Sequence, residues 1–206
     1  MLEKINQEVK KMRVMSKVVL AAIFVLWAGA SLCLAAATAT RNVRAIVPTM
    51  NQSLTLTVSK ITPGTPDVWT PATEVDFGTL THDAANHIFR GAVFYAIDVD
   101  VVDNTNAWTL SHARTSLKMD AVNNLDDNVN VAFVKQTSGT VGAELSKFSF
   151  NNSNGKSFTK AQLDGGWLRI YYGVATGSGD ATGVVLVPEI KPSGSYQGTI
   201  TLTLTP

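Results

Sequence analysis

Strict alternation of apolar and polar residues near the C-terminus constrains the fold more than any other feature of the sequence. Ile200, Leu202 and Leu204 alternate with threonines. Successive side chains of an extended strand point to opposite faces, so this pattern predicts a strand with one apolar face. Threonine suits the outer face because its β-branched side chain fits a pleated sheet. Such a strand must pair with a sheet, since alone it leaves its backbone groups unsatisfied.

The same two-residue period recurs along the chain. It is found in residues 54–58, 93–101, 129–133 and 170–174. Segments rich in Gly, Pro, Asn and Asp separate these runs, and such residues favour turns. Only residues 159–163 suggest a helix, a short one ahead of Asp164-Gly165-Gly166. Short strands with frequent turns predict an all-β fold, a single antiparallel β-sandwich over residues 53–206.

The N-terminus has the three parts of a secretory signal. Five positive residues precede an apolar run over residues 18–34, and small residues follow it. A basic stretch, an apolar core and an A-x-A-like exit together indicate an export signal that is removed. We therefore predict a signal peptide over residues 1–37, with cleavage after Ala37 or Ala39.

Two other interpretations of this segment remain open. An apolar run of this length could form a permanent transmembrane anchor, since a span needs roughly 20 apolar residues. The run ends in small residues, however, and no positive residue follows before Arg41. Cys33 suggests a lipoprotein, but Leu32 before it is larger than the usual lipobox residue. The start codon stays open between Met1, Met12 and Met15.

Loss of the signal would remove the only cysteine of the chain, Cys33. The mature protein of about 167 residues would then have no disulfide, and a core of that size suffices because such a domain buries about two thirds of its unfolded surface. Residues 38–52 are predicted to be an N-terminal extension or a first strand. We expect an extracytoplasmic location: the periplasm, the cell surface or the medium.

The net charge of the mature chain and the distribution of its basic residues indicate which classes of partner it is not expected to bind. The signal holds five of the 17 basic and two of the 16 acidic residues, so 12 and 14 remain, a net charge of −2. No basic patch suggests nucleic acid as a partner. No Lys/Arg cluster suggests a membrane surface either, so membrane contact is expected only through the transient signal.

Two stretches resemble bacterial surface proteins. Asp76-Phe77-Gly78-Thr79-Leu80 resembles the opening of many fimbrial and envelope β-sandwich subunits. Residues 192–204, a G-x-Y turn that leads into the Thr-rich final strand, resemble the C-terminus of spore coat protein U-like and pilin-like domains. The resemblance implies a secreted immunoglobulin-like or pilin-like sandwich that assembles into surface structures. It implies no catalytic residues, and the missing cysteine pair departs from the pilin-like pattern.

The histidines do not form a recognisable metal or catalytic motif. His82 and His87 flank a polar loop and His112 follows a strand start. Zinc requires three or four ligands at compatible spacing, so we interpret all three as solvated loop residues. No G-x-S-x-G elbow accompanies them, and we predict no catalytic, cofactor-binding or metal-binding residue and no enzymatic activity.

Two acidic clusters are candidate calcium sites because calcium binds several oxygen ligands. Asp98, Asp100 and Asp103 lack the Gly and Glu that an EF-hand loop needs at its sixth and twelfth positions. Asp98 and Asp100 share one face of a predicted strand, and we expect that face to be solvated. Residues 126–128, Asp-Asp-Asn, are interpreted in the same way.

The mature tryptophans suggest an alternative function. Aromatic side chains in a sandwich usually fill the core, and Trp108 and Trp167 are predicted to do so. Trp69 lies between Pro66 and Pro71 and is the one expected to be exposed. An exposed aromatic residue would suit a binding module for glycans or for another protein.

The sequence thus favours a structural subunit of a surface fibre, pilus-like assembly or coat, with the binding module as the alternative. Expected partners are further copies of the chain or another surface protein, bound through edge strands. The final strand is predicted to close its own sandwich. Val43, Ala45 and Val47 alternate ahead of the domain, and this N-terminal segment is predicted to be the strand exchanged between subunits.

Overall fold

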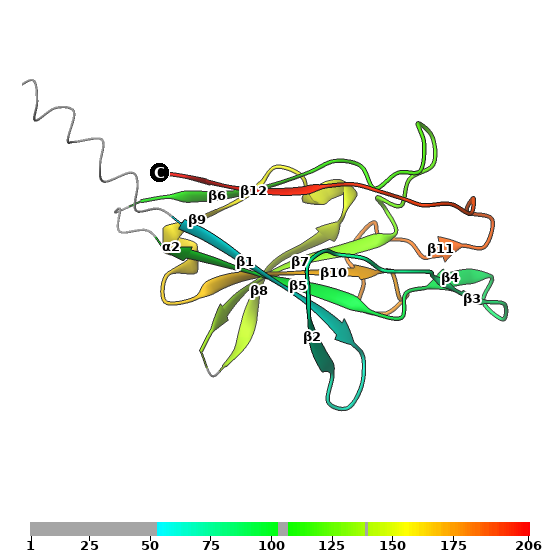
Figure 1. Ribbon diagram of the computed structural model, residues 1–206, viewed down its shortest axis with the longest axis horizontal. Coiled ribbons are helices and arrows are strands. Elements are labelled where there is room, and N and C mark those ends of the chain that lie inside the picture. Colours follow the sequence, from blue (N-terminus) through cyan, green and yellow to red (C-terminus); the bar gives the residue numbers. More distant parts are fainter. Residues whose placement is uncertain (1–52, 103–106, 139) are drawn as a thin grey trace, which may run out of the picture. The chain divides into compact units, whose positions relative to one another are not determined.

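The computed structural model describes residues 53–102, 107–138 and 140–206. These residues form antiparallel sheets and almost no helix, which confirms the predicted all-β, sandwich-like fold (Figure 1). The predicted signal peptide, the N-terminal segment over residues 38–52 and Asp103 lie outside the described residues.

One large sheet has six strands in the order β2-β1-β5-β10-β7-β8. Its strands are β1 (Ser53–Thr62), β2 (Val68–Ala72), β5 (Phe94–Val102), β7 (Val129–Thr137), β8 (Thr140–Ser149) and β10 (Trp167–Val174). Directly paired residues share a face, as Val58, Ile97 and Ile170 do on neighbouring strands. Apolar residues from distant parts of the sequence therefore line one inner face.

Two three-stranded sheets accompany the large sheet. The sheet that we call the small sheet has the order β12-β6-β9, from β12 (Ile200–Thr205), β6 (Thr109–Arg114) and β9 (Lys156–Thr159). The other has the order β11-β4-β3, from β11 (Val187–Pro188), β4 (Ile88–Arg90) and β3 (Thr81–Asp83). A 3-10 turn, η2 (Asn151–Ser153), precedes β9.

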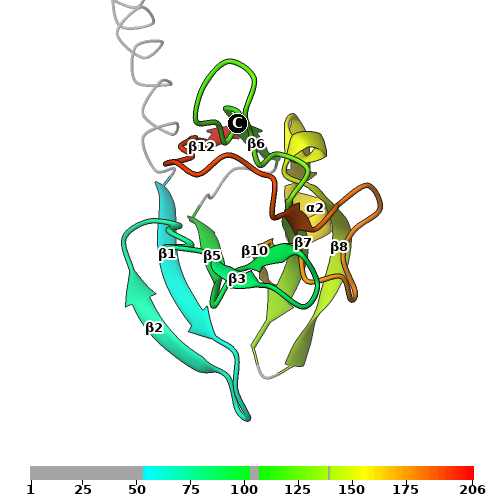
Figure 2. The ribbon, with the colours of Figure 1, turned by 90° about the vertical axis from the view of Figure 1, so that its right-hand side faces the viewer.

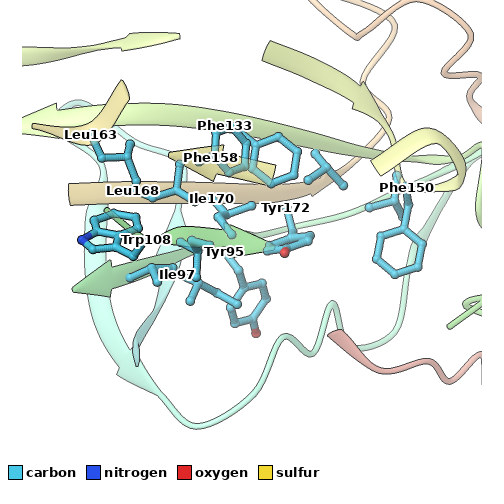
Figure 3. Packing of buried hydrophobic residues seen from close by; sticks show 14 residues of the cluster. Tyr95, Ile97, Trp108, Phe133, Phe150, Phe158, Leu163, Leu168, Ile170 and Tyr172 are labelled. Atoms are coloured by element: carbon cyan, nitrogen blue, oxygen red, sulfur yellow. The ribbon is translucent and has the colours of Figure 1, made fainter. Parts of the chain in front are cut away.

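The main core lies between the large and small sheets (Figure 3). Phe133 of β7 packs against Phe158 of β9, with ring centroids 4.9 Å apart. Trp108 and Leu110 enter from the β6 side, and Ile170 from β10. On β5, β7 and β10 the inward residues are those that the two-residue period assigned to one face, whereas β6 and β9 were not among the predicted strands.

The short helix predicted around residues 159–163 is present as α2 (Lys160–Leu163). Thr159 caps it: its hydroxyl accepts a hydrogen bond from the backbone N–H of Gln162, whose side chain accepts one from Thr159 N–H. This capping box fixes where the helix begins. Leu163 is buried in the main core, so the helix helps to close one end of the sandwich.

Candidate functional site

The small sheet covers the inner face of the large sheet as far as β5 but leaves β1 partly uncovered. Val99 on β5 is 1% exposed, whereas Leu56, its direct partner on β1, is 47% exposed. Leu54 and Val58, on the same face of β1, are only half-buried. The inner face of β1 thus presents a row of aliphatic side chains that are only partly covered.

The small sheet approaches this row with its edge strand, β12. The contact of Phe158 with Phe133 places β9 over the β7 side, so β12 is the strand on the side of β1 (Figure 2). β12 pairs with β6 along its whole length, and its other edge has no strand partner among the described residues. Its inward side chains, Ile200, Leu202 and Leu204, are also half-buried.

We call this opening the seam. It consists of the inward residues of β1 and β12, namely Leu54, Leu56, Val58, Ile200, Leu202 and Leu204. An extended segment laid beside β12 could form backbone hydrogen bonds with the free edge and pack alternate side chains onto β1. An uncovered strand edge beside apolar side chains is a template for pairing with another chain.

The seam ends at a cavity of about 620 Å³. Ile200 belongs to both, and the segments 75–80 and 191–198 form much of the cavity wall. The two stretches that resemble surface-protein motifs therefore line one space. The Tyr95 hydroxyl donates to the Asp76 carbonyl at 2.5 Å, and Gln197 exchanges backbone hydrogen bonds with Lys118, so both walls are tied to the domain.

His82 and His87 are exposed, as predicted, on the β3–β4 hairpin. Each contacts a different oxygen of the Glu189 carboxylate: His82 Nε2 lies 3.2 Å from Oε2 and His87 Nδ1 lies 2.9 Å from Oε1. Within the described residues no group of three or more His, Cys, Asp or Glu could hold a metal ion.

The prediction for His112 is wrong, because its side chain is only 1% exposed and lies in the core. Nδ1 lies 2.9 Å from the Ser153 carbonyl, which can only accept, so Nδ1 carries the proton. Nε2 then accepts the hydrogen bond from the Tyr172 hydroxyl at 2.9 Å. Both polar groups of the buried neutral imidazole are therefore satisfied.

This arrangement predicts a loss of stability in mild acid. Burial lowers the pKa of His112 below its ordinary value of 6.5. Below about pH 6.5 the unfolded chain takes up a proton at His112 that the folded chain excludes. The contribution of the neutral His112 to the free energy of unfolding is therefore fully present above this pH and falls as the pH drops. Urea unfolding from about pH 7 to about pH 5.5 should show a decrease of up to about 1.4 kcal/mol per pH unit.

His112→Gln removes the titrating group and keeps an amide donor and acceptor. We expect this variant to be less stable overall but to lose most of that pH dependence. His82→Gln, at an exposed histidine, is the matched control and should keep it. An unchanged slope in His112→Gln would show that other groups cause the effect.

The acidic residues are less solvated than predicted. Asp98 is half-buried and accepts hydrogen bonds from Arg169 Nε (2.6 Å) and Nη2 (2.8 Å), so the solvated interpretation is wrong for it. Asp100 is exposed, as expected. Asp126 is buried and pairs with Arg114 at 2.7 Å, which corrects the same interpretation there.

Asn128 was likewise expected to be solvated, but it is buried. Its side-chain amide donates to the carbonyls of Val185 and Leu186, at 2.9 and 3.1 Å. Asp127 next to it is exposed. The Asn128 side chain thus holds the loop that follows β10 in place through hydrogen bonds to its backbone carbonyls.

The tryptophans divide between the two faces of the large sheet. Trp108 is buried in the core and Trp69 is 43% exposed, as predicted. The prediction that Trp167 is a core residue is wrong. It lies one position before the inward-facing Leu168, so it points to the outer face, where its indole N–H donates to Asp98 at 3.0 Å.

Comparison with protein-family models, with curated proteins and with solved structures found no match to this chain. Among the residues that the structure describes, no helix is long and apolar enough to cross a membrane.

Proposed function

We propose that the chain is a secreted, non-enzymatic structural subunit of the bacterial cell surface that assembles through strand addition at the seam. The observation that supports this proposal best is the edge of β12 that has no strand partner in the described part of the chain, beside the exposed Leu56 of β1. Among the described residues nothing fully covers this apolar row, and its contact with water has a cost in free energy.

The proposed occupant is the N-terminal segment of a neighbouring subunit. In this segment Val43, Ala45 and Val47 alternate with other residues, which is the pattern of a strand with one apolar face. Its backbone would pair with β12 while these side chains cover β1. The segment directly precedes Ser53, the first residue of β1, so each subunit carries a donor segment covalently attached to its domain.

Deleting residues 38–49 should leave a folded domain that no longer assembles. The deletion removes the proposed donor but none of the strands of the large and small sheets. Size-exclusion chromatography should then give a monomer, and circular dichroism should give an unchanged β spectrum, where the mature protein gives oligomers. If the deletion unfolds the domain, the segment is an ordinary core strand.

A point substitution in the seam provides a second test. Leu56→Asn should weaken assembly with little loss of stability, because this leucine is already 47% exposed. Thr57→Asn, on the opposite face of the same strand, is the matched control and should assemble normally. A mature protein that stays monomeric at high concentration and forms no filaments in native extracts would favour the alternative, a binding module.

A further inference from the structure

The outer face of the large sheet carries a cluster of aromatic and charged residues on the side opposite the seam. Asp98 of β5 and Arg169 of β10 are direct partners in the sheet and both point outward. Trp69 of β2 reaches them although β1 and β5 lie between β2 and β10. The edge strand must therefore curl toward the outer face, as the β1–β2 hairpin does in Figure 2. We call the cluster the aromatic platform: Trp69, Phe94, Asp98, Trp167, Arg169 and Tyr171.

Close contacts hold Trp69 in one orientation. The Arg169 guanidinium lies over its ring, 4.8 Å from the centroid. Tyr171 packs edge-on, at 6.5 Å and 72°, and Phe94 supports Tyr171 at 6.3 Å. Asp98 fixes Arg169 through two parallel hydrogen bonds, the geometry that restricts a guanidinium most.

Part of this cluster covers apolar residues of the sheet itself. Ile61 is a direct strand partner of Trp69 and Phe94 and is 0% exposed, although the small sheet packs on the opposite face. Burial of Ile61 explains why the side of the platform that faces the sheet is apolar. It does not account for Trp69 itself, which remains 43% exposed while the guanidinium occupies one side of its ring.

We propose that the platform binds a neutral oligosaccharide of equatorially substituted pyranose units. The flat face of such a sugar presents C–H bonds with partial positive charge, which pack favourably on the negative face of an indole ring. The Tyr171 hydroxyl and Arg169 Nη1, whose contact with each other is long at 3.5 Å, lie beside the ring and can bond sugar hydroxyls.

The charges of the platform select against an anionic ligand. Asp98 lies within 2.6 Å of Arg169, so the pair presents no net positive charge to a carboxylate or sulfate. The fixed ring and fixed guanidinium also lower the entropic cost of binding, since neither has to be ordered by the ligand. This function goes beyond assembly at the seam and uses the other face of the large sheet, so each can fail without the other.

The test is titration of the mature protein with cellohexaose, a neutral probe, and with an oligogalacturonate of equal length, an anionic probe. Indole N–H signals in two-dimensional NMR report on each tryptophan without any substitution. Cellohexaose should shift the Trp69 and Trp167 signals and leave that of the buried Trp108 unchanged. No shift with cellohexaose, or a stronger response to the anionic probe, would overturn the proposal.

Variants then distinguish a role of Trp69 in binding sugar from a role in covering Ile61. Trp69→Ala should weaken cellohexaose binding by about tenfold or more, whereas Trp69→Phe, which keeps an aromatic face, should retain part of it. Val68→Ala, at the exposed neighbour on the opposite face of β2, should bind as the unmodified protein does. Equal binding by a folded Trp69→Ala variant would show that the tryptophan only covers Ile61 and would overturn the assignment.

Discussion

Deletion of residues 199–206 is expected to abolish folding of the domain. The deletion removes β12, which pairs with β6 over six residue positions. Ile200, Leu202 and Leu204 leave the core with it, and these half-buried side chains together contribute roughly 3 kcal/mol. Loss of the paired strand and exposure of β6 add to this, against a typical total stability of about 5–15 kcal/mol. Circular dichroism and proton NMR dispersion measure the result.

Two point variants on the same strand distinguish loss of packing from loss of chain length. Leu202→Asp places a charge against the core and should destabilise the domain strongly. Thr203→Asp, one residue further on the exposed face, should fold normally. A truncated domain with native dispersion would mean that β12 is an accessory strand, and the seam would then lack a fixed wall.

Gly166→Ala is expected to cost about 3 kcal/mol of stability, because the new methyl group meets main chain and not a flexible side chain. A Cβ at this position would lie 2.1 Å from the carbonyl oxygen of Gln136. Trp167, the next residue, pairs with Gln136 at the start of β10, so the backbone can separate only by breaking that end of the ladder. Urea denaturation gives the change in the free energy of unfolding.

Gly173→Ala, within β10, is the matched control. Its Cβ would meet only Phe94 Cβ at 3.4 Å, an ordinary contact. Alanine also restricts the unfolded chain more than glycine does, so this variant should be unchanged or more stable by up to about 1 kcal/mol. Equal stability of the two variants would show that Gly166 does not lie this close to β7.

The strand faces could be predicted from the sequence because the two-residue period is a local property of extended chain. The same rule applies to residues whose predicted positions were wrong. His112 stands two residues after Leu110 and so falls on the inner face, and Trp167 stands one before Leu168 and so falls on the outer face. Counting back from Ile170, which belongs to a predicted run, would have corrected the prediction for Trp167, whereas residues 109–114 were not among the predicted strands and His112 could be placed only from β6 itself.

How far each face is covered could not be predicted, because coverage depends on strands that are distant in sequence. Leu54, Leu56 and Val58 form a uniform pattern, yet only the arrangement of β12 relative to β1 leaves Leu56 in water. The partner of Asp98 is non-local, since Arg169 reaches it through the pairing of β10 with β5, whereas Arg114 reaches Asp126 across the loop between β6 and β7. For the same reason the seam and the aromatic platform emerge from the fold and not from any motif.

Disulfide trapping between subunits tests the central claim most directly, because the only cysteine of the chain, Cys33, lies in the predicted signal peptide. Thr201 and Thr203 point outward from β12. Each is replaced by cysteine in combination with Arg44→Cys or Ile46→Cys, which would lie on the same face of a donor strand paired beside β12. Cross-strand neighbours on one face are close enough for a disulfide to form.

Assembly through the seam predicts a ladder of covalent oligomers on non-reducing gels for at least one of these combinations, and none for Thr203→Cys combined with a cysteine at Thr70 on the β2 edge. Reductant should collapse the ladder to a monomer. If every combination gives only internally crosslinked monomer, or no crosslink at all, the N-terminal segment does not join one subunit to the next and the account is contradicted.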